Sequence, residues 1–344
     1  MSAASVSLLQ PGGETAWDAF VRGRPDGTFF HLAGWKRVIE KAFGHKTFYL
    51  AARRAGSVVG VLPLTLVRSL LFGNSLISNA FCVYGGILAA DEEAREALSA
   101  VAIEIAKTEH VDCLEFRSVT PAHSGWVPKE NLYVTFRRAI AADNDVNMKA
   151  IPRKQRAMVR KGISNGLKSQ CDTDVERLHH IYAHSVRNLG TPVFSKRYFQ
   201  CLKDEFGDAC DVVTVVQGEK PVASVMNFYF RGEVLPYYGG GLTEARDLAA
   251  NDFMYWEVMR RAADRGCRSY DFGRSKTGTG AYHFKRNWGF EPTPLTYEFY
   301  LVKAQKIPEV NPLNPKFRAF IGLWRRLPLP LTKWLGPAIV RGIG

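Results

Sequence analysis

The chain has 344 residues, of which 46% are hydrophobic, and a formal net charge of +13. This length suits two globular domains, and without a basic-then-apolar leader or an apolar run of roughly 18 residues we expect no signal peptide and no spanning helix. Because the six cysteines form no Cys-x-x-Cys pair and the eight histidines no zinc motif, we expect reduced cysteines and no metal centre.

The positive charge is concentrated in two segments. Met148 to Cys171 contains seven basic residues and no acidic one, and Val310 to Gly344 contains six and none. These thirteen residues equal the whole net charge, so the rest of the chain is balanced. Charge held in two patches predicts two contacts with anionic partners.

The first half reads as alternating helices and strands. Helices are predicted over Trp17–Arg22 and Trp35–Phe43, the second closed by Gly44, and over Asp91–His110 with Asp91 as N-cap. Strands are predicted over Thr47–Arg53, Ser57–Val67, a segment ending at Val83–Gly86, Val111–Ser118 and Tyr133–Ala139.

The second half repeats this order. The same offset of 163 residues separates Thr28 from Thr191, Trp35 from Tyr198, and Phe43 from Phe206. The repeat continues with predicted strands over Asp211–Gln217 and Pro221–Phe230, and Tyr238–Gly240 then matches Tyr84–Gly86. It ends with a predicted helix over Ala249–Arg265, closed by Gly266, and a strand at Tyr270–Phe272. We therefore predict tandem copies of one α+β unit, each a mixed sheet flanked by helices. The domains are 1–145, a basic connecting helix 146–170, 171–305, and a basic amphipathic tail 306–344.

The connecting helix places Pro152 in its first turn. Arg153, Arg156 and Arg160 follow at i, i+3 and i+7 on one face. That face suits a phosphate clamp, because the guanidinium fork binds phosphate oxygens in pairs. The alternative is a solvated connecting helix.

The stretch from Tyr270 to Gly289 is the strongest candidate for chemistry. A strand ending at Asp271 is followed by flexible Gly273, Gly278 and Gly280, by the cations Arg274, Lys276 and Lys285, and by Phe284 and Trp288 on one helix face. The arrangement suits a polyanionic or carbonyl-bearing substrate; the alternative is a basic surface loop. A P-loop is excluded, because Thr279 stands after Gly278 where that motif requires lysine. A dinucleotide-binding loop is excluded, because His283 stands where that motif requires a third small residue.

The tail carries Phe317, Phe320, Ile321 and Trp324 at helical spacing, flanked by Lys316, Arg318, Arg325 and Arg326. A basic amphipathic segment with tryptophan predicts contact of residues 310–344 with an anionic membrane surface. The alternative is a helix docked on its own protein.

The motifs Tyr237–Gly241, Asp271–Lys276, Gly278–Gly280, Phe284–Lys285 and Trp288–Phe290 resemble those of the FemAB family, most closely the FemAB-like proteins associated with XrtA/PEP-CTERM exosortase systems. The likeness extends from Trp17 to Leu301. It implies two tandem GNAT-type acyltransferase domains, the first degenerate and serving as scaffold or acceptor site. It also implies a bacterial, cytoplasmic protein, in one alternative peripheral on the inner face of the cytoplasmic membrane.

The activity implied is transfer of an aminoacyl or acyl group to an amine or hydroxyl of a cell-envelope, peptidoglycan or exopolysaccharide precursor. The co-substrate would be aminoacyl-tRNA or acyl-CoA, with no bound cofactor, and the partners a phosphate-bearing or glycan acceptor and tRNA. By the same likeness, acceptor phosphates would contact Lys36 or Arg37, and Lys196 or Arg197. The Arg/Gln-x-x-Gly-x-Gly/Ala loop that binds coenzyme A pyrophosphate in ordinary GNAT enzymes is missing, and residues 242–251 contain only Arg246 as a cation. This disfavours acyl-CoA as donor without excluding it.

For direct attack without a covalent intermediate, Lys285 and the N–H groups around Gly278 and Gly280 are the predicted oxyanion donors. Asp271 is the candidate base, with a purely structural role as alternative, and Tyr237 and Tyr238 would orient the acceptor or pack in the core. Two further functions stay open. One is an acyl-CoA-dependent N-acetyltransferase acting on an exopolysaccharide amino sugar, and the other is a non-catalytic, membrane-associated scaffold.

Overall fold

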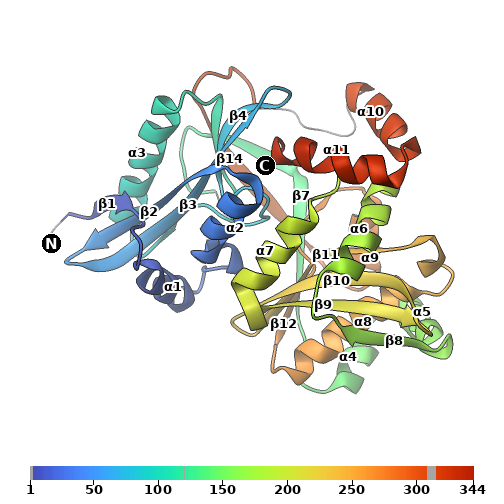
Figure 1. Ribbon diagram of the computed structural model, residues 1–344. Coiled ribbons are helices and arrows are strands. Elements are labelled where there is room, and N and C mark those ends of the chain that lie inside the picture. The colour runs from blue at the N-terminus through green and yellow to red at the C-terminus, as the bar shows by residue number, and fades with distance from the viewer. Residues whose placement is uncertain (1–2, 120, 308–314) are drawn as a thin grey trace. The chain divides into compact units, whose positions relative to one another are not determined.

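A computed structural model describes residues 3–119, 121–307 and 315–344 (Figure 1). The chain forms two compact units. Unit 1 comprises residues 1–132, 295–310 and 339–344, and unit 2 comprises residues 133–294 and 311–338.

Unit 1 is a mixed sheet with helices on both faces. Its strands run in the order β1-β2-β3-β4-β6-β14, with β5 beside β3, and all pairs are antiparallel except β4 with β6. The elements are β1 (Ser5–Leu8), α1 (Glu14–Gly23), η1 (Phe29–His31), α2 (Gly34–Phe43), β2 (Lys46–Arg54), β3 (Ser57–Ser69), β4 (Gly73–Ser78), β5 (Leu88–Ala89), α3 (Glu92–Thr108), β6 (Cys113–Phe116) and β14 (Pro292–Leu301).

The alternation of side chains along β2 explains these layers, because successive residues of a strand point to opposite faces. Phe48 packs in a cluster with Leu98 and Ala102 of α3. Its neighbour Tyr49 lies 5.3 Å from Trp17 of α1, ring centre to ring centre. Each face of the strand is thus covered by a different helix.

Unit 2 repeats the architecture, with the strand order β7-β12-β11-β10-β9-β8 and β13 beside β7; only β11 and β12 run parallel. Its elements are β7 (Val127–Ala139), α4 (Asn144–Ala150), α5 (Arg153–Ser164), β8 (Leu167–Cys171), α6 (Glu176–Leu189), α7 (Lys196–Phe206), η2 (Gly207–Ala209), β9 (Cys210–Gln217), β10 (Lys220–Phe230), β11 (Glu233–Gly241), η3 (Thr243–Ala245), α8 (Ala250–Asp264), β12 (Ser269–Asp271), β13 (Ser275–Lys276) and α9 (Gly280–Asn287), followed by α10 (Pro315–Arg326) and α11 (Leu329–Arg341).

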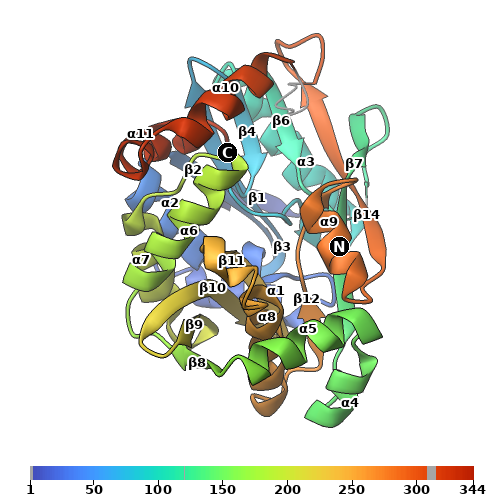
Figure 2. The ribbon, with the colours of Figure 1, turned by 90° about the vertical axis from the view of Figure 1, so that its right-hand side faces the viewer.

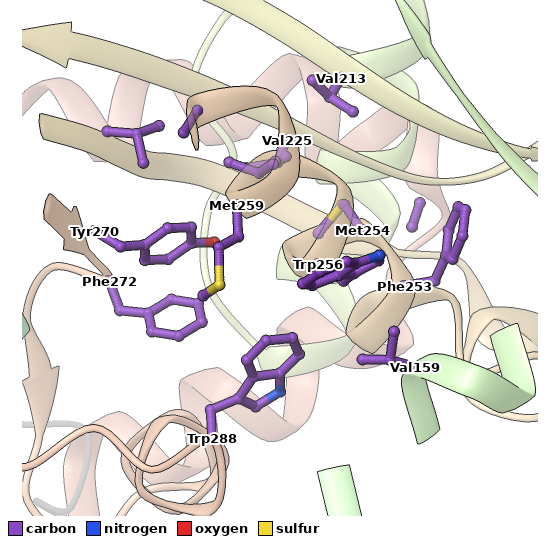
Figure 3. Packing of buried hydrophobic residues seen from close by; sticks show 14 of the residues in the cluster. Val159, Val213, Val225, Phe253, Met254, Trp256, Met259, Tyr270, Phe272 and Trp288 are labelled. Atoms are coloured by element: carbon purple, nitrogen blue, oxygen red, sulfur yellow. The ribbon is translucent and has the colours of Figure 1, made fainter. Parts of the chain in front are cut away.

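Helix α8 forms the centre of the unit 2 core. Its residues Met254 and Met259 are fully buried, and Met259 lies among Tyr270, Phe272 and Trp288 (Figure 3). Helices α6 and α7 cover the other side of strands β9 to β11 (Figure 2). The order β-β-β-α-β occurs in both units, as β2-β3-β4-α3-β6 and as β9-β10-β11-α8-β12, so the predicted repeat of mixed sheets flanked by helices is confirmed.

Three details of the prediction were wrong. The strand expected to end at Val83–Gly86 is β4, which ends at Ser78, because Asn79 and Phe81 have positive φ angles and turn the chain out of the sheet. Tyr84 therefore lies outside the sheet, whereas Tyr238, its match in the second half of the sequence, lies within β11. Pro152 is the N-cap of α5 and not a residue of its first turn, and the segment 146–170 also contains the end of α4 and the start of β8.

The unit borders also differ from the expected domain borders at 145 and 305. Residues 137–139 of β7 pair with β12 and residues 133–134 pair with β13, so this part of β7 belongs to unit 2. Residues 298–301 of β14 pair with β6 and belong to unit 1. The cause is long-range strand pairing, which a repeat in the sequence does not reveal.

The tail packs on the protein in each unit. In unit 2, Trp324 is 2% exposed, and Arg325 donates a hydrogen bond to the carbonyl of Leu189. In unit 1, the His45 ring nitrogen Nε2 lies 3.0 Å from the carbonyl oxygen of Arg341. The expected side chains of Lys316, Phe317 and Arg318 lie outside the described residues. None of the described helices is long and apolar enough to cross a bilayer.

Candidate functional site

Lys285 on α9 lies at the centre of the predicted loop. Its ammonium group donates hydrogen bonds to the carbonyl oxygens of Gly273 at 2.9 Å and Arg274 at 3.2 Å. The same nitrogen lies 5.6 Å from the centre of the Phe136 ring, a distance at which a cation is attracted to the ring face. The lysine therefore closes the turn that follows β12.

Burial lowers the pKa of Lys285 from 10.5 to about 7. The negative charge of Asp271 opposes this shift, and the positive charge of Arg274 adds to it. Near neutral pH the amine is thus divided between its charged and neutral forms. Such a lysine is typical of catalytic sites, although ion-pair networks also shift pKa values.

Asp271 is only 1% exposed. It accepts hydrogen bonds from the backbone N–H of Gly273 at 2.6 Å and from the hydroxyl of Thr135 at 3.4 Å. A carboxylate so enclosed fixes the turn and supplies negative charge to Lys285. Its burial favours the structural alternative over direct proton abstraction from a substrate.

The other two cations of the loop lie over one aromatic ring of β7. The Arg274 guanidinium lies 4.4 Å and the Lys276 ammonium 5.8 Å from the centre of the Tyr133 ring. The hydroxyl of Ser275, between them, is buried and has no hydrogen-bond partner among the described residues. Gly278, with a φ of 76°, makes the turn into α9.

Helix α9 begins at Gly280, where the Thr279 hydroxyl caps it by accepting from the N–H of Tyr282. Since the first N–H groups of a helix have no partner within the helix, those of Gly280 and Ala281 are available to an anionic group.

The C-terminal end of α9 is fixed by a buried polar network. Trp288 is fully buried, and its indole N–H donates to the Asp252 carboxylate at 2.9 Å. The side-chain amide of Gln155 donates to the same oxygen, also at 2.9 Å. Phe284 packs against the same core. The helix carrying Lys285 is thereby tied to α8 and to α5.

Strands β11 and β12 separate soon after they meet. Among the described residues, Glu233 and Val234 are the ones that pair with β12, so the two strands diverge from Leu235 onward. A register shift places Tyr237 as an extra residue between Pro236 and Tyr238. A bulge beside such a divergence is a common feature of binding sites.

The two tyrosines of this strand face an aromatic cluster. The hydroxyls of Tyr238 and Tyr198 lie 2.8 Å apart, and Tyr182 and Phe199 pack around the Tyr238 ring. The Tyr237 ring lies 5.5 Å from that of Phe228. The core-packing alternative therefore describes Tyr238.

The remaining predicted cations lie outside the Lys285 turn. Arg153 and Arg160 of α5 are exposed and Arg156 is half-buried. Two predicted phosphate ligands form ion pairs instead, Lys36 with Glu40 in unit 1 and Lys196 with Glu176 in unit 2, each at 2.7 Å. Arg37 lies 3.7 Å from Glu14, and Arg197 is exposed. A phosphate would have to compete with these carboxylates.

The sequence analysis missed the side chains that β7 and α8 supply. Phe136, Tyr133 and Asp252 lie far along the chain from Lys285 and belong to no local motif. The prediction of a strand over Tyr133–Ala139 was the only available signal. Among the described residues, no group of three potential ligands could hold a metal ion.

Comparison with known proteins bears on this architecture. Residues 151–286 match the model of the acetyltransferase (GNAT) domain. The fold is GNAT-like. The crystal structure of FemX superposes with a TM-score of 0.66 at 16% identity, covering 87% of this chain and 98% of FemX.

Two further structures agree. A tandem GNAT protein from the clavulanic acid biosynthesis pathway gives a TM-score of 0.55 at 13% identity, covering 88% of this chain and all of the other (100%). The structure of L-PGS from Bacillus licheniformis gives a TM-score of 0.53 at 11% identity, covering 93% of this chain and 98% of L-PGS. No curated protein sequence matches the chain. At these identities the likeness shows the fold, so the predicted tandem GNAT-type architecture is confirmed, and the association with exosortase systems stays a prediction.

Proposed function

We propose that the chain is an acyltransferase whose transfer site is the Lys285 turn of unit 2. The observation that carries the proposal is a half-buried lysine, of pKa about 7, in the last turn of α9, where its ammonium group is held against the turn that follows β12. An ammonium group has three N–H donors, and two of them are engaged by Gly273 and Arg274. The third can donate to an oxyanion.

The reaction is direct attack. The acceptor nitrogen or oxygen forms a bond to the carbonyl carbon of an activated ester or thioester, and negative charge develops on the carbonyl oxygen. Collapse of the tetrahedral intermediate breaks the bond to the leaving sulfur or oxygen, which takes up the proton that the acceptor gives up. Lys285 stabilises the oxyanion in its charged form, and Asp271 keeps part of the lysine population charged at neutral pH.

The proposed donor is an acyl thioester such as acyl-CoA. The GNAT domain match over residues 151–286 supports it, and β11, which diverges from β12 after Val234, can hydrogen-bond an extended amide chain as an added strand would. Aminoacyl-tRNA is the second candidate donor, favoured by the exposed cations Arg153 and Arg160, since arginine binds phosphate well.

The proposed acceptor is an amine or hydroxyl of a phosphate-bearing precursor of the cell envelope or of an exopolysaccharide. This setting follows from the motifs shared with exosortase-associated FemAB proteins. On the tail, Phe320, Leu323 and Trp334 are 37%, 63% and 74% exposed, and Arg325 and Arg326 are exposed beside them. These side chains support contact of the tail with an anionic membrane, where such acceptors are assembled.

The test is donor consumption by the purified protein with acetyl-CoA and, separately, charged tRNA, against a panel of amino-sugar acceptors. Lys285→Ala should lower kcat by about 100-fold to 1000-fold, as loss of an oxyanion donor does. Arg286→Ala, an exposed cation on the same helix, is the matched control and should keep wild-type turnover. Wild-type turnover by Lys285→Ala would refute the proposed site. Failure of the wild-type protein to bind or consume either donor would favour the scaffold alternative.

A further inference from the structure

The hairpin between β3 and β4 of unit 1 (Figure 1) carries two exposed leucines at its turn. Leu70 and Leu71 are 108% and 78% exposed, the highest values among the large hydrophobic residues described. The turn is ordered, since Ser69 pairs with Gly73 and the Ser69 hydroxyl accepts from the N–H of Leu71 at 3.3 Å. Large apolar side chains held out by a well-formed turn indicate a contact with an apolar partner.

Cations surround the base of this hairpin. Arg68 donates to the Glu109 carboxylate at 2.9 Å, and Lys46 donates to it at 2.6 Å. The end of the chain lies against the same place, because a Cβ added at Gly342 would come within 2.6 Å of the Ser69 hydroxyl oxygen. Exposed Arg341 adds a third cation on the side of Gly44, since a Cβ added at Gly44 would lie 3.7 Å from its guanidinium. The acidic residues nearby are Glu109 and Asp112, and the Asp112 carboxylate accepts a hydrogen bond from the N–H of Asn74.

Apolar surface continues beyond the ion pairs. Glu109 forms part of the wall of a shallow surface hollow whose other walls include Phe48, Val101 and Ile105. Ile343, near the hairpin base, is 37% exposed. The hairpin thus has leucines at its tip, cations at its base and an apolar hollow beside them. Such a surface is typical of proteins that contact both the headgroups and the acyl chains of a bilayer.

We propose that the β3–β4 hairpin inserts Leu70 and Leu71 into an anionic lipid surface, with Arg68 and Arg341 at the level of the lipid phosphates. A folded protein partner fits less well. Two side chains on a narrow tip bury far less than the roughly 1,000 Å² that a stable protein interface requires. Insertion into a bilayer has no such minimum, because each buried leucine contributes on its own. The proposal is independent of chemistry at Lys285.

The experiment is co-sedimentation of the full chain with phosphatidylcholine vesicles, with and without phosphatidylglycerol. The double variant Leu70→Ser/Leu71→Ser should bind the anionic vesicles about 100-fold more weakly than wild type, since each leucine contributes roughly tenfold. The control Leu8→Ser/Val119→Ser alters two apolar residues of the same unit that are 46% and 47% exposed, and it should bind as wild type does. Equal binding by the hairpin variant and wild type, or no binding by wild type, overturns the proposal.

Misfolding and self-association of the chain are tested separately. Thermal unfolding of the hairpin variant should match that of wild type, because the substituted side chains make little buried contact. Size-exclusion chromatography tests a second copy of the chain as the occupant. If the hairpin variant turned a wild-type dimer into a monomer while vesicle binding was unchanged, the tip would be a protein interface and the lipid proposal would be wrong.

Discussion

Replacing Lys285 by methionine tests whether the amine of this half-buried side chain is desolvated enough to lower its pKa. The pKa falls from 10.5 to about 7, and burial is the largest cause. Since one pKa unit corresponds to about 1.4 kcal/mol, the ammonium form is destabilised in the folded protein by on the order of 5 kcal/mol relative to the unfolded chain. Methionine fills a similar volume and carries no charge, so it removes this cost.

The sign of the pH dependence follows from proton binding. The unfolded chain binds this proton more tightly, so the cost is fully present below pH 7 and declines as the pH rises toward 10.5. The gain in unfolding free energy of Lys285→Met over wild type should therefore be about 3 kcal/mol larger at pH 6 than at pH 9. Urea denaturation at both pH values measures it, with Arg286→Met as the exposed control. An equal difference at both pH values would mean that Lys285 titrates as in water, and the proposed site would lose its basis.

Two further substitutions probe how the site and tail are held. Trp288→Phe removes a fully buried indole and leaves the Asp252 carboxylate with one donor fewer, so urea denaturation should show a loss of about 2–4 kcal/mol. Gly190→Ala puts a methyl group within 2.4 Å of Ile321, so α10 should detach and a protease should cleave the tail faster than in wild type. Because Gly190 has a φ of 80°, the variant should also lose about 1 kcal/mol of unfolding free energy through strain at the end of α6. An equal cleavage rate would contradict the packing.

Local sequence chemistry was sufficient to locate the Lys285 turn. Gly273 and Gly278 do have positive φ angles, and Trp288 does anchor α9, because glycine and helical spacing act over a few residues. Asp271 and Arg274 in the same turn shift the pKa of Lys285, but part of the packing around its amine is not local. Phe136 reaches it through the pairing of β7 with β12, and no motif encodes which distant strand will pair with a given edge.

The repeat was informative about order and misleading about geometry. Tyr84 and Tyr238 match in sequence, yet Tyr238 lies in a strand and Tyr84 follows one, because Asn79 and Phe81 leave the sheet with positive φ angles. The amphipathic tail likewise had two interpretations from its sequence. Trp324 is buried and Trp334 is 74% exposed, so the segment packs on the protein with one part and presents another to solvent.

Asp271→Asn separates the two roles considered for this carboxylate. If Asp271 acts through Lys285, removing its charge lowers the pKa of the lysine below 7, because that charge raises it. Activity that depends on the ammonium form should then be nearly normal at pH 6 and should decline at a lower pH than in wild type, and Lys285→Arg should show no such decline because arginine stays charged. If Asp271 were instead the base that accepts the acceptor's proton, activity would fall at every pH, including acidic pH values at which Lys285 is still charged. A pH–rate profile of the two variants distinguishes these outcomes, and the burial of Asp271, with both observed donors coming from its own turn and from β7, favours the first.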